Sequence, residues 1–134
     1  MEFFMKKVLL AFLLTCTFSF AEIKSIPVNP EFVTSGITII DIRTKPEWQE
    51  TGILKDSIPI TFFDAHGKYD AQKFLDMLSG YVKKDEEFAI ICRTGNRTTV
   101  VSKFLDQMGY RVINLEGGIK ALMKQGYPLS KYEQ

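Results

Sequence analysis

Short apolar runs of strand length alternate along this chain with segments whose apolar residues recur at helical spacing. We expect strands at Thr38–Ile42, Phe88–Ile91 and Tyr110–Leu115, a weaker one at Ser57–Ile60 whose proline suits a sheet edge, and one more at Ile23–Ile26. Strands that are apolar on both faces and separated by helices are typical of a parallel sheet. The sequence therefore predicts an α/β fold, with a parallel sheet of about five strands covered by helices on both faces.

The expected helices fill the intervals between these strands. They run through Pro46–Glu50, Ala71–Leu78, Val100–Met108 and Ile119–Met123. A glycine follows each of them and predicts where each helix stops: Gly52, Gly80, Gly109 and Gly126. Because the chain has no internal repeat, low-complexity tract or linker, we expect one domain.

The first 21 residues have the layout of a secretory signal peptide. Lys6 and Lys7 precede the mainly apolar stretch Val8–Phe20, and Ser19 and Ala21 place small residues before a cleavage site. We therefore expect residues 1–21 to be removed and residues 22–134 to form the domain. An N-terminal membrane anchor and a lipid on Cys16 are the alternatives, although the unbroken apolar core is shorter than the ~20 residues of a membrane span.

Export changes the expected chemistry of the remaining chain. Removal of Lys6, Lys7 and Glu2 leaves equal numbers of basic and acidic residues, so neither nucleic acid nor a membrane surface is an expected partner. Cys92 becomes the single cysteine, which excludes an internal disulfide. Keeping one thiol in an oxidising compartment, the periplasm if the cell is Gram-negative, favours a reactive sulfur. The single histidine, His66, has no neighbouring ligand, so we expect it at the surface and expect no metal or cofactor.

Cys92 stands where the strand Phe88–Ile91 turns into the next helix. Loop amides and a helix N-terminus would then point at the sulfur, with Arg93 and Arg97 beside it, and such surroundings stabilise a thiolate and an anion. We expect Cys92 to be the nucleophile. The expected substrate-binding residues are the rest of the loop: Arg93, Thr94, Gly95, Asn96, Arg97 and Thr98.

Individual roles in this loop follow from residue type. Gly95 permits a positive φ that curls the loop around an anion, while Asn96 and Thr98 either contact the substrate or cap the helix. Asp41 and Arg43 end a neighbouring strand. We expect them to support the site as an ion pair that ties neighbouring loops together, and Asp41 is also a candidate partner for Arg93. Glu47 and Trp48 are expected to be structural, the tryptophan in the core.

Three segments resemble the motifs of single-domain rhodaneses, a sulfurtransferase family. Asp41–Trp48 is similar to the family's Asp-Val-Arg segment, Cys92–Thr98 to its active-site loop, and Leu115–Ile119 with Gly126–Pro128 to its C-terminal signature. The order and spacing match over nearly all of residues 22–134. One difference is that Ile53 follows Gly52 where the family commonly has histidine.

The resemblance implies an enzyme that moves sulfane sulfur, from a donor such as thiosulfate to cyanide or a thiol, through a persulfide on Cys92. A protein thiol is a further expected acceptor. A non-enzymatic persulfide carrier would need the same loop, so that alternative stays open. A tyrosine-type phosphatase has Cys-x5-Arg, whereas here Arg97 is five positions after Cys92 and Thr98 is sixth. A thiol redox protein is disfavoured because residues 22–134 contain no Cys-x-x-Cys.

Overall fold

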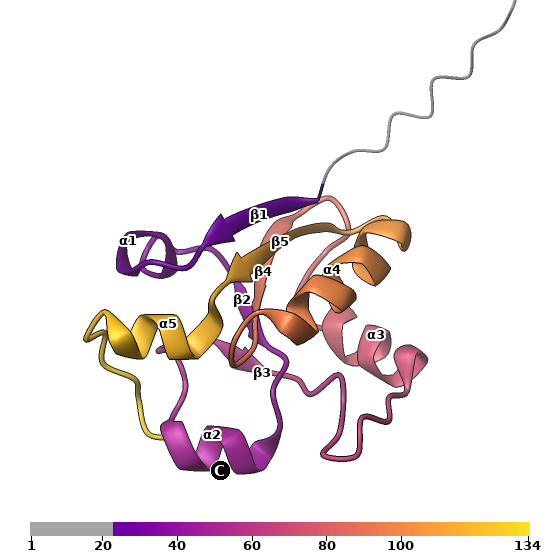
Figure 1. Cartoon of the computed structure of the whole chain (residues 1–134). Helices are drawn as coiled ribbons and strands as arrows, with labels where there is room; N and C mark the ends of the chain where they lie inside the picture. Colours follow the sequence, from indigo (N-terminus) through magenta and orange to yellow (C-terminus); the bar gives the residue numbers. More distant parts are fainter. Residues whose placement is uncertain (1–22) are drawn as a thin grey trace, which may run out of the picture.

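The computed structural model describes residues 23–134, which form a central sheet with helices on both sides (Figure 1). The expected signal peptide, including Cys16, lies outside the described residues. Within residues 23–134, no helix has the length and apolar character needed to cross a membrane.

All five strands of the sheet run parallel, in the order β1-β5-β4-β2-β3. Their bounds are β1 Lys24–Pro27, β2 Ile39–Asp41, β3 Ile58–Pro59, β4 Glu87–Ile91 and β5 Arg111–Glu116. The helices are α1 Pro30–Val33, α2 Lys45–Thr51, α3 Ala71–Ser79, α4 Asn96–Gln107 and α5 Gly118–Lys124. The predicted parallel sheet of about five strands is confirmed, and the short strand β3 with its proline lies at the edge as expected.

The sheet separates two hydrophobic clusters, and alternate residues of each strand face one or the other. Ile40 and Ile90 pack with α3 and α4 residues such as Phe74 and Leu105 on one face. On the other face, the neighbouring strand residues pack with α1 and α5; they are Ile39, Ala89, Ile91 and Ile113. Burying each large side chain stabilises the fold by about 1.5–3 kcal/mol. The expected cover of helices on both faces is confirmed.

One helix was not expected from the sequence pattern. The four-residue α1 begins at Pro30, and the Oδ1 of Asn29 caps it by accepting a hydrogen bond from the Phe32 N–H at 2.8 Å. Both are ordinary helix-start signals. The helix is too short for its apolar residues to show a helical period, so periodicity could not find it.

The C-terminal tail packs against α2, near which Figure 1 marks the end of the chain. Ile53 and Ser130 exchange two backbone hydrogen bonds of 2.8 Å, and the rings of Trp48 and Tyr132 lie 5.4 Å apart. A Cβ on Gly52 would lie 2.4 Å from the Ser130 carbonyl oxygen, so this close approach requires glycine. The tail therefore holds in place the helix that follows β2.

Candidate active site

The segment around Cys92 forms the predicted strand, loop and helix. β4 ends at Ile91, Cys92 follows directly, and α4 begins at Asn96. Gly95 precedes the helix with φ of 96°, a left-handed conformation that favours glycine. The expected positive φ at Gly95 is confirmed, and the turn places the start of a 12-residue helix beside the thiol.

The sulfur of Cys92 lies inside the loop with 1% of the residue exposed. The Gly95 N–H donates a hydrogen bond to Sγ at 3.2 Å, and the thiol lies 3.6 Å from Oγ1 of Thr98. Thr98 is buried and donates from its hydroxyl to the Gly95 carbonyl at 3.1 Å. Neither Asn96 nor Thr98 is the N-cap, because Gly95 occupies that position; the capping alternative is wrong for both.

The start of α5 is hydrogen-bonded to the backbone of the Cys92 loop. The carbonyl oxygens of Cys92 and Arg93 accept hydrogen bonds of 2.9 Å from the N–H groups of Ile119 and Lys120. A Cβ on Gly118 would lie 2.4 Å from the Cys92 carbonyl oxygen, which excludes any larger residue at this contact. Gly118, the first residue of α5, therefore lets this helix start pack directly against the thiol loop.

Arg97 reaches from the first turn of α4 to Glu47 on α2. Its Nη1 and Nη2 lie 2.6 and 2.8 Å from Oε1 and Oε2 of Glu47, a bidentate pair with 26% and 21% of the two side chains exposed. The pairing lowers the pKa of Glu47 to about 2 and raises that of Arg97. The Glu47 carboxylate is the main cause of the raised pKa of Arg97, so the guanidinium stays charged beside the thiol loop.

Asp41 and Arg43 form a second pair, at the end of β2, that is fully buried. The Arg43 Nε and Nη2 donate to Asp41 at 3.0 and 2.8 Å, and the remaining donors bind Thr51 Oγ1 and the Gly52 carbonyl. The predicted ion pair that ties neighbouring loops together is confirmed. The expectation that Asp41 also holds Arg93 is wrong, since Arg93 is exposed and Asp41 binds Arg43.

Residues 29–125 match the model of the family described as "Rhodanese-like domain". The chain belongs to this family. It is 30% identical over 97 residues to "Sulfurtransferase" of Allochromatium vinosum, covering 72% of this chain and 80% of that protein. It is 32% identical over 83 residues to YtwF of Bacillus subtilis, covering 62% and 70%.

A solved structure agrees with these sequence matches. The crystal structure of a rhodanese-related protein from Thermoplasma volcanium superposes with a TM-score of 0.62 at 26% identity, covering 81% of this chain and 99% of the other. The rhodanese-like fold is thus established, and the sequence matches place the chain in a sulfurtransferase family.

The predicted nucleophile and substrate-binding residues of this rhodanese-like domain, residues 92–98, fall into a buried and an exposed group, with Arg97 partly exposed. Cys92, Gly95 and Thr98 gather around the sulfur, whereas Arg93, Thr94 and Asn96 are exposed. The surface position of His66 and the core position of Trp48 are confirmed. Among residues 23–134, no group of three or more His, Cys, Asp or Glu residues could hold a metal ion.

Glu47 is the site residue whose role the sequence did not indicate. Thr44 and Glu47 carry the spacing of a capping box, and Glu47 does accept from the Thr44 N–H and hydroxyl at 3.3 and 3.1 Å. That local signal explains the structural expectation. Its partner Arg97 lies 50 positions away, and only the parallel order of β2 and β4 brings the two helix starts together.

A cavity of about 570 Å³ lies near the edge strand β3, between Trp48 and residues of α3. Its lining is mainly aromatic and aliphatic and includes Phe62, Tyr69 and Met77. No residue from 92 to 98 lines it, so this cavity is separate from the thiol loop.

Proposed function

We propose that this protein is a sulfurtransferase that accepts sulfane sulfur from a donor such as thiosulfate as a persulfide on Cys92 and passes it to a thiophilic acceptor. The acceptor is cyanide in an assay, and a small-molecule or protein thiol in the cell. The observation that carries the proposal is a single sulfur enclosed by a strand end, a left-handed glycine and a helix start, with the Gly95 N–H 3.2 Å from Sγ.

The proposed reaction has two steps, and the second step restores the protein to its starting state. In the first, the Cys92 thiolate attacks the outer sulfur of thiosulfate; the sulfur–sulfur bond of the donor breaks, and its electron pair leaves with sulfite. In the second, cyanide or a thiolate attacks the terminal sulfur of the persulfide. Thiocyanate or an organic persulfide leaves, and the Cys92 thiolate is restored.

The contacts of the loop support persulfide chemistry. Sulfur carries negative charge both as thiolate and as persulfide, and the Gly95 N–H together with the start of α4 directs positive dipole ends at it. In the thiol form, Sγ donates a weak hydrogen bond to Oγ1 of Thr98 at 3.6 Å, while the Thr98 hydroxyl donates to the Gly95 carbonyl. Only 1% of Cys92 is exposed, so water has little access to the Sγ atom that carries the transferred sulfur.

The phosphatase alternative lacks support from this loop. Six positions after Cys92, where Cys-x5-Arg has its arginine, stands the buried Thr98, whose hydroxyl contacts the sulfur itself. The arginine one position earlier turns to Glu47. A phosphate dianion would thus lack an arginine fork at the position where Cys-x5-Arg supplies one.

Intact-protein mass spectrometry tests the proposed function. Thiosulfate should add the mass of one sulfur atom to the chain, and cyanide added afterwards should remove it as thiocyanate. The Cys92→Ser variant should show neither change while keeping its far-UV circular dichroism spectrum. An unchanged wild-type mass with thiosulfate and with organic thiosulfonates would contradict the proposal.

Turnover separates the enzyme from a persulfide carrier. An enzyme should form thiocyanate continuously in the presence of excess thiosulfate and cyanide, with ping-pong kinetics. A carrier would form one thiocyanate per chain and then stop until a partner protein is added.

We further propose export of the protein, on the strength of the N-terminal pattern from Lys6 to Ala21. The chain recovered from the periplasmic fraction of a Gram-negative host should begin at Glu22. A chain that keeps its N-terminus in the membrane fraction would favour the anchor, and one modified at Cys16 would favour the lipoprotein.

A further inference from the structure

The segments Asp41–Trp48 and Cys92–Thr98 contain three arginines, and two of these arginines form ion pairs with carboxylates. Arg43 is buried and binds both oxygens of Asp41. Arg97 has its guanidinium fork filled by Glu47, at 2.6 and 2.8 Å. Arg93 is exposed and takes part in none of the ion pairs formed within residues 23–134.

The charges of the reactive site therefore balance. Once Cys92 is a thiolate, the three arginines are matched by the two carboxylates and the sulfur. Lys120 and Glu116, both exposed, border the loop with opposite charges and leave the balance unchanged. Glu47 keeps its charge throughout the neutral range, because its pKa is lowered to about 2.

A balanced site treats sulfur donors differently according to their charge. Thiosulfate brings two negative charges to an anionic nucleophile, so its binding beside the thiolate needs an excess of positive charge. The loop amides supply partial positive charge, which suits the sulfur atom itself. Organic thiosulfonates carry one negative charge and organic persulfides one or none, although each offers the same transferable sulfur.

We propose that Glu47, by occupying the guanidinium fork of Arg97, makes this site select sulfur donors that carry one negative charge or none over dianionic thiosulfate. This inference rests on the proposed transfer through Cys92. Methanethiosulfonate is the matched probe. The Cys92 thiolate attacks its outer sulfur, the bond between that sulfur and the sulfonyl sulfur breaks, and the electron pair leaves on methanesulfinate.

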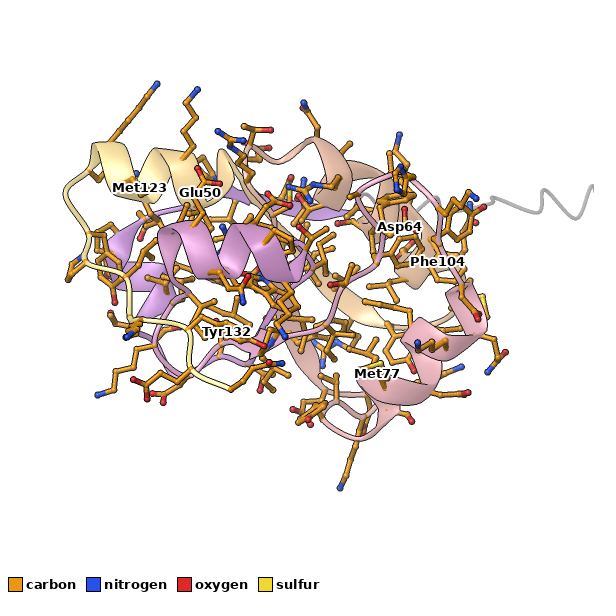
Figure 2. All side chains as sticks on the ribbon, turned by 90° about the horizontal axis from the view of Figure 1, so that it is seen from below. Glu50, Asp64, Met77, Phe104, Met123 and Tyr132 are labelled. Atoms are coloured by element: carbon orange, nitrogen blue, oxygen red, sulfur yellow. The ribbon has the colours of Figure 1, made fainter. Side chains whose placement is uncertain are left out.

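The experiment compares the kcat/KM of thiosulfate and methanethiosulfonate, with cyanide as the common acceptor, in three proteins. Glu47→Gln removes the charge and keeps the shape of the side chain. Glu50→Gln is the matched control: Glu50 lies on the same helix (Figure 2), is exposed, and forms no ion pair within the described residues.

Wild type should prefer methanethiosulfonate. Glu47→Gln should raise kcat/KM for thiosulfate about tenfold through a lower KM, and kcat/KM for methanethiosulfonate about threefold. Thiosulfate carries two negative charges and methanethiosulfonate one, so removing the charge of Glu47 changes the electrostatic free energy of binding twice as much for thiosulfate. Glu50→Gln should leave the ratio of the two donors unchanged. A wild-type preference for thiosulfate, or an equal loss with both donors in Glu47→Gln, would overturn the inference and leave Glu47 with a structural role only.

Ionic strength provides a second measurement that needs no variant. Salt weakens both attraction and repulsion between charges. If the site holds no excess positive charge for a dianion, kcat/KM for thiosulfate should stay level or rise as sodium chloride is added. A steep fall for thiosulfate beside a level value for methanethiosulfonate would show an attracting site and contradict the inference.

The same measurements distinguish failure of the proposed sulfur transfer from failure of the proposed donor selection. If neither donor adds sulfur to Cys92 in the wild-type protein, sulfur transfer itself is contradicted. If both donors add sulfur and thiosulfate is the better one, only the donor selection is contradicted.

Discussion

The two arginine–carboxylate pairs at the carboxyl edge of the sheet differ in sequence separation, burial and neighbours. Asp41 and Arg43 are two residues apart and fully buried, and Arg43 also binds Thr51 and the Gly52 carbonyl. Glu47 and Arg97 are 50 positions apart and about a quarter exposed, and they join the start of α2 to the start of α4.

These differences give the two pairs different tasks. Breaking the buried pair leaves a charge without water or a partner, which costs several kcal/mol, so this pair behaves as a fixed part of the framework. The partly exposed pair can exchange its partner for water at a much smaller cost. This second pair is the one that can adjust to a ligand at the thiol loop, because its Arg97 stands in the first turn of α4, directly after that loop.

The largest effect is expected from breaking the buried pair. Asp41→Asn leaves Arg43 charged and unpaired, and should lower the free energy of unfolding by about 3–5 kcal/mol. Urea denaturation measures this loss. The double variant Asp41→Leu with Arg43→Met removes both charges and should be more stable than Asp41→Asn. Equal or greater instability of the double variant would show that the arginine hydrogen bonds to Thr51 and Gly52, rather than the buried charge, dominate.

The sequence predicted the buried pair of Asp41 and Arg43, but it did not predict the partly exposed pair of Glu47 and Arg97. Asp41 and Arg43 follow one strand in direct succession, so their proximity is local and the pattern of a strand end indicates it. The predicted turn at Cys92 was local in the same way, because an apolar run followed by a loop glycine and a helical period specifies it.

The contact between Glu47 and Arg97 depends instead on strand order. β2 and β4 are neighbours although β3 lies between them in sequence, and no residue pattern within either segment specifies that pairing. The same reason explains why the hydrogen bonds from α5 to the Cys92 carbonyl were not foreseen. Local patterns predict the elements and the position of Cys92 between a strand and a helix, while the partners of the loop come from tertiary structure.

A smaller loss is expected from the partly exposed pair. Glu47→Gln keeps one hydrogen-bond acceptor and removes the charge, so the free energy of unfolding should fall by about 1 kcal/mol. Glu50→Gln, on the same helix, should change it by less than about 0.5 kcal/mol. A loss with Glu47→Gln as large as with Asp41→Asn would contradict the distinction between the two pairs.

The stability given by Glu47 should depend on pH in a defined window. Its pKa in the folded protein, about 2, lies below the usual 4.5, so the folded state favours the ionised carboxylate. The stabilisation is fully present above pH 4.5 and is lost as the pH falls towards 2. Denaturation of wild type and Glu47→Gln across this range should give curves that differ at neutral pH and converge in acid. A constant difference down to pH 2 would mean that the charge of Glu47 does not stabilise the fold.

The smallest expected effect is the change with salt concentration in the stability that each arginine–carboxylate pair provides. Raising sodium chloride from about 0.1 M to about 1 M shortens the screening length from about 10 Å to about 3 Å, which weakens ion pairs that solvent can reach. The difference in unfolding free energy between wild type and Glu47→Gln should therefore shrink by about half. The loss caused by Asp41→Asn should stay the same, since neither Asp41 nor Arg43 is exposed. Equal salt dependence of both differences would show that solvent reaches the two pairs alike, and Arg97 would then be no more adjustable than Arg43.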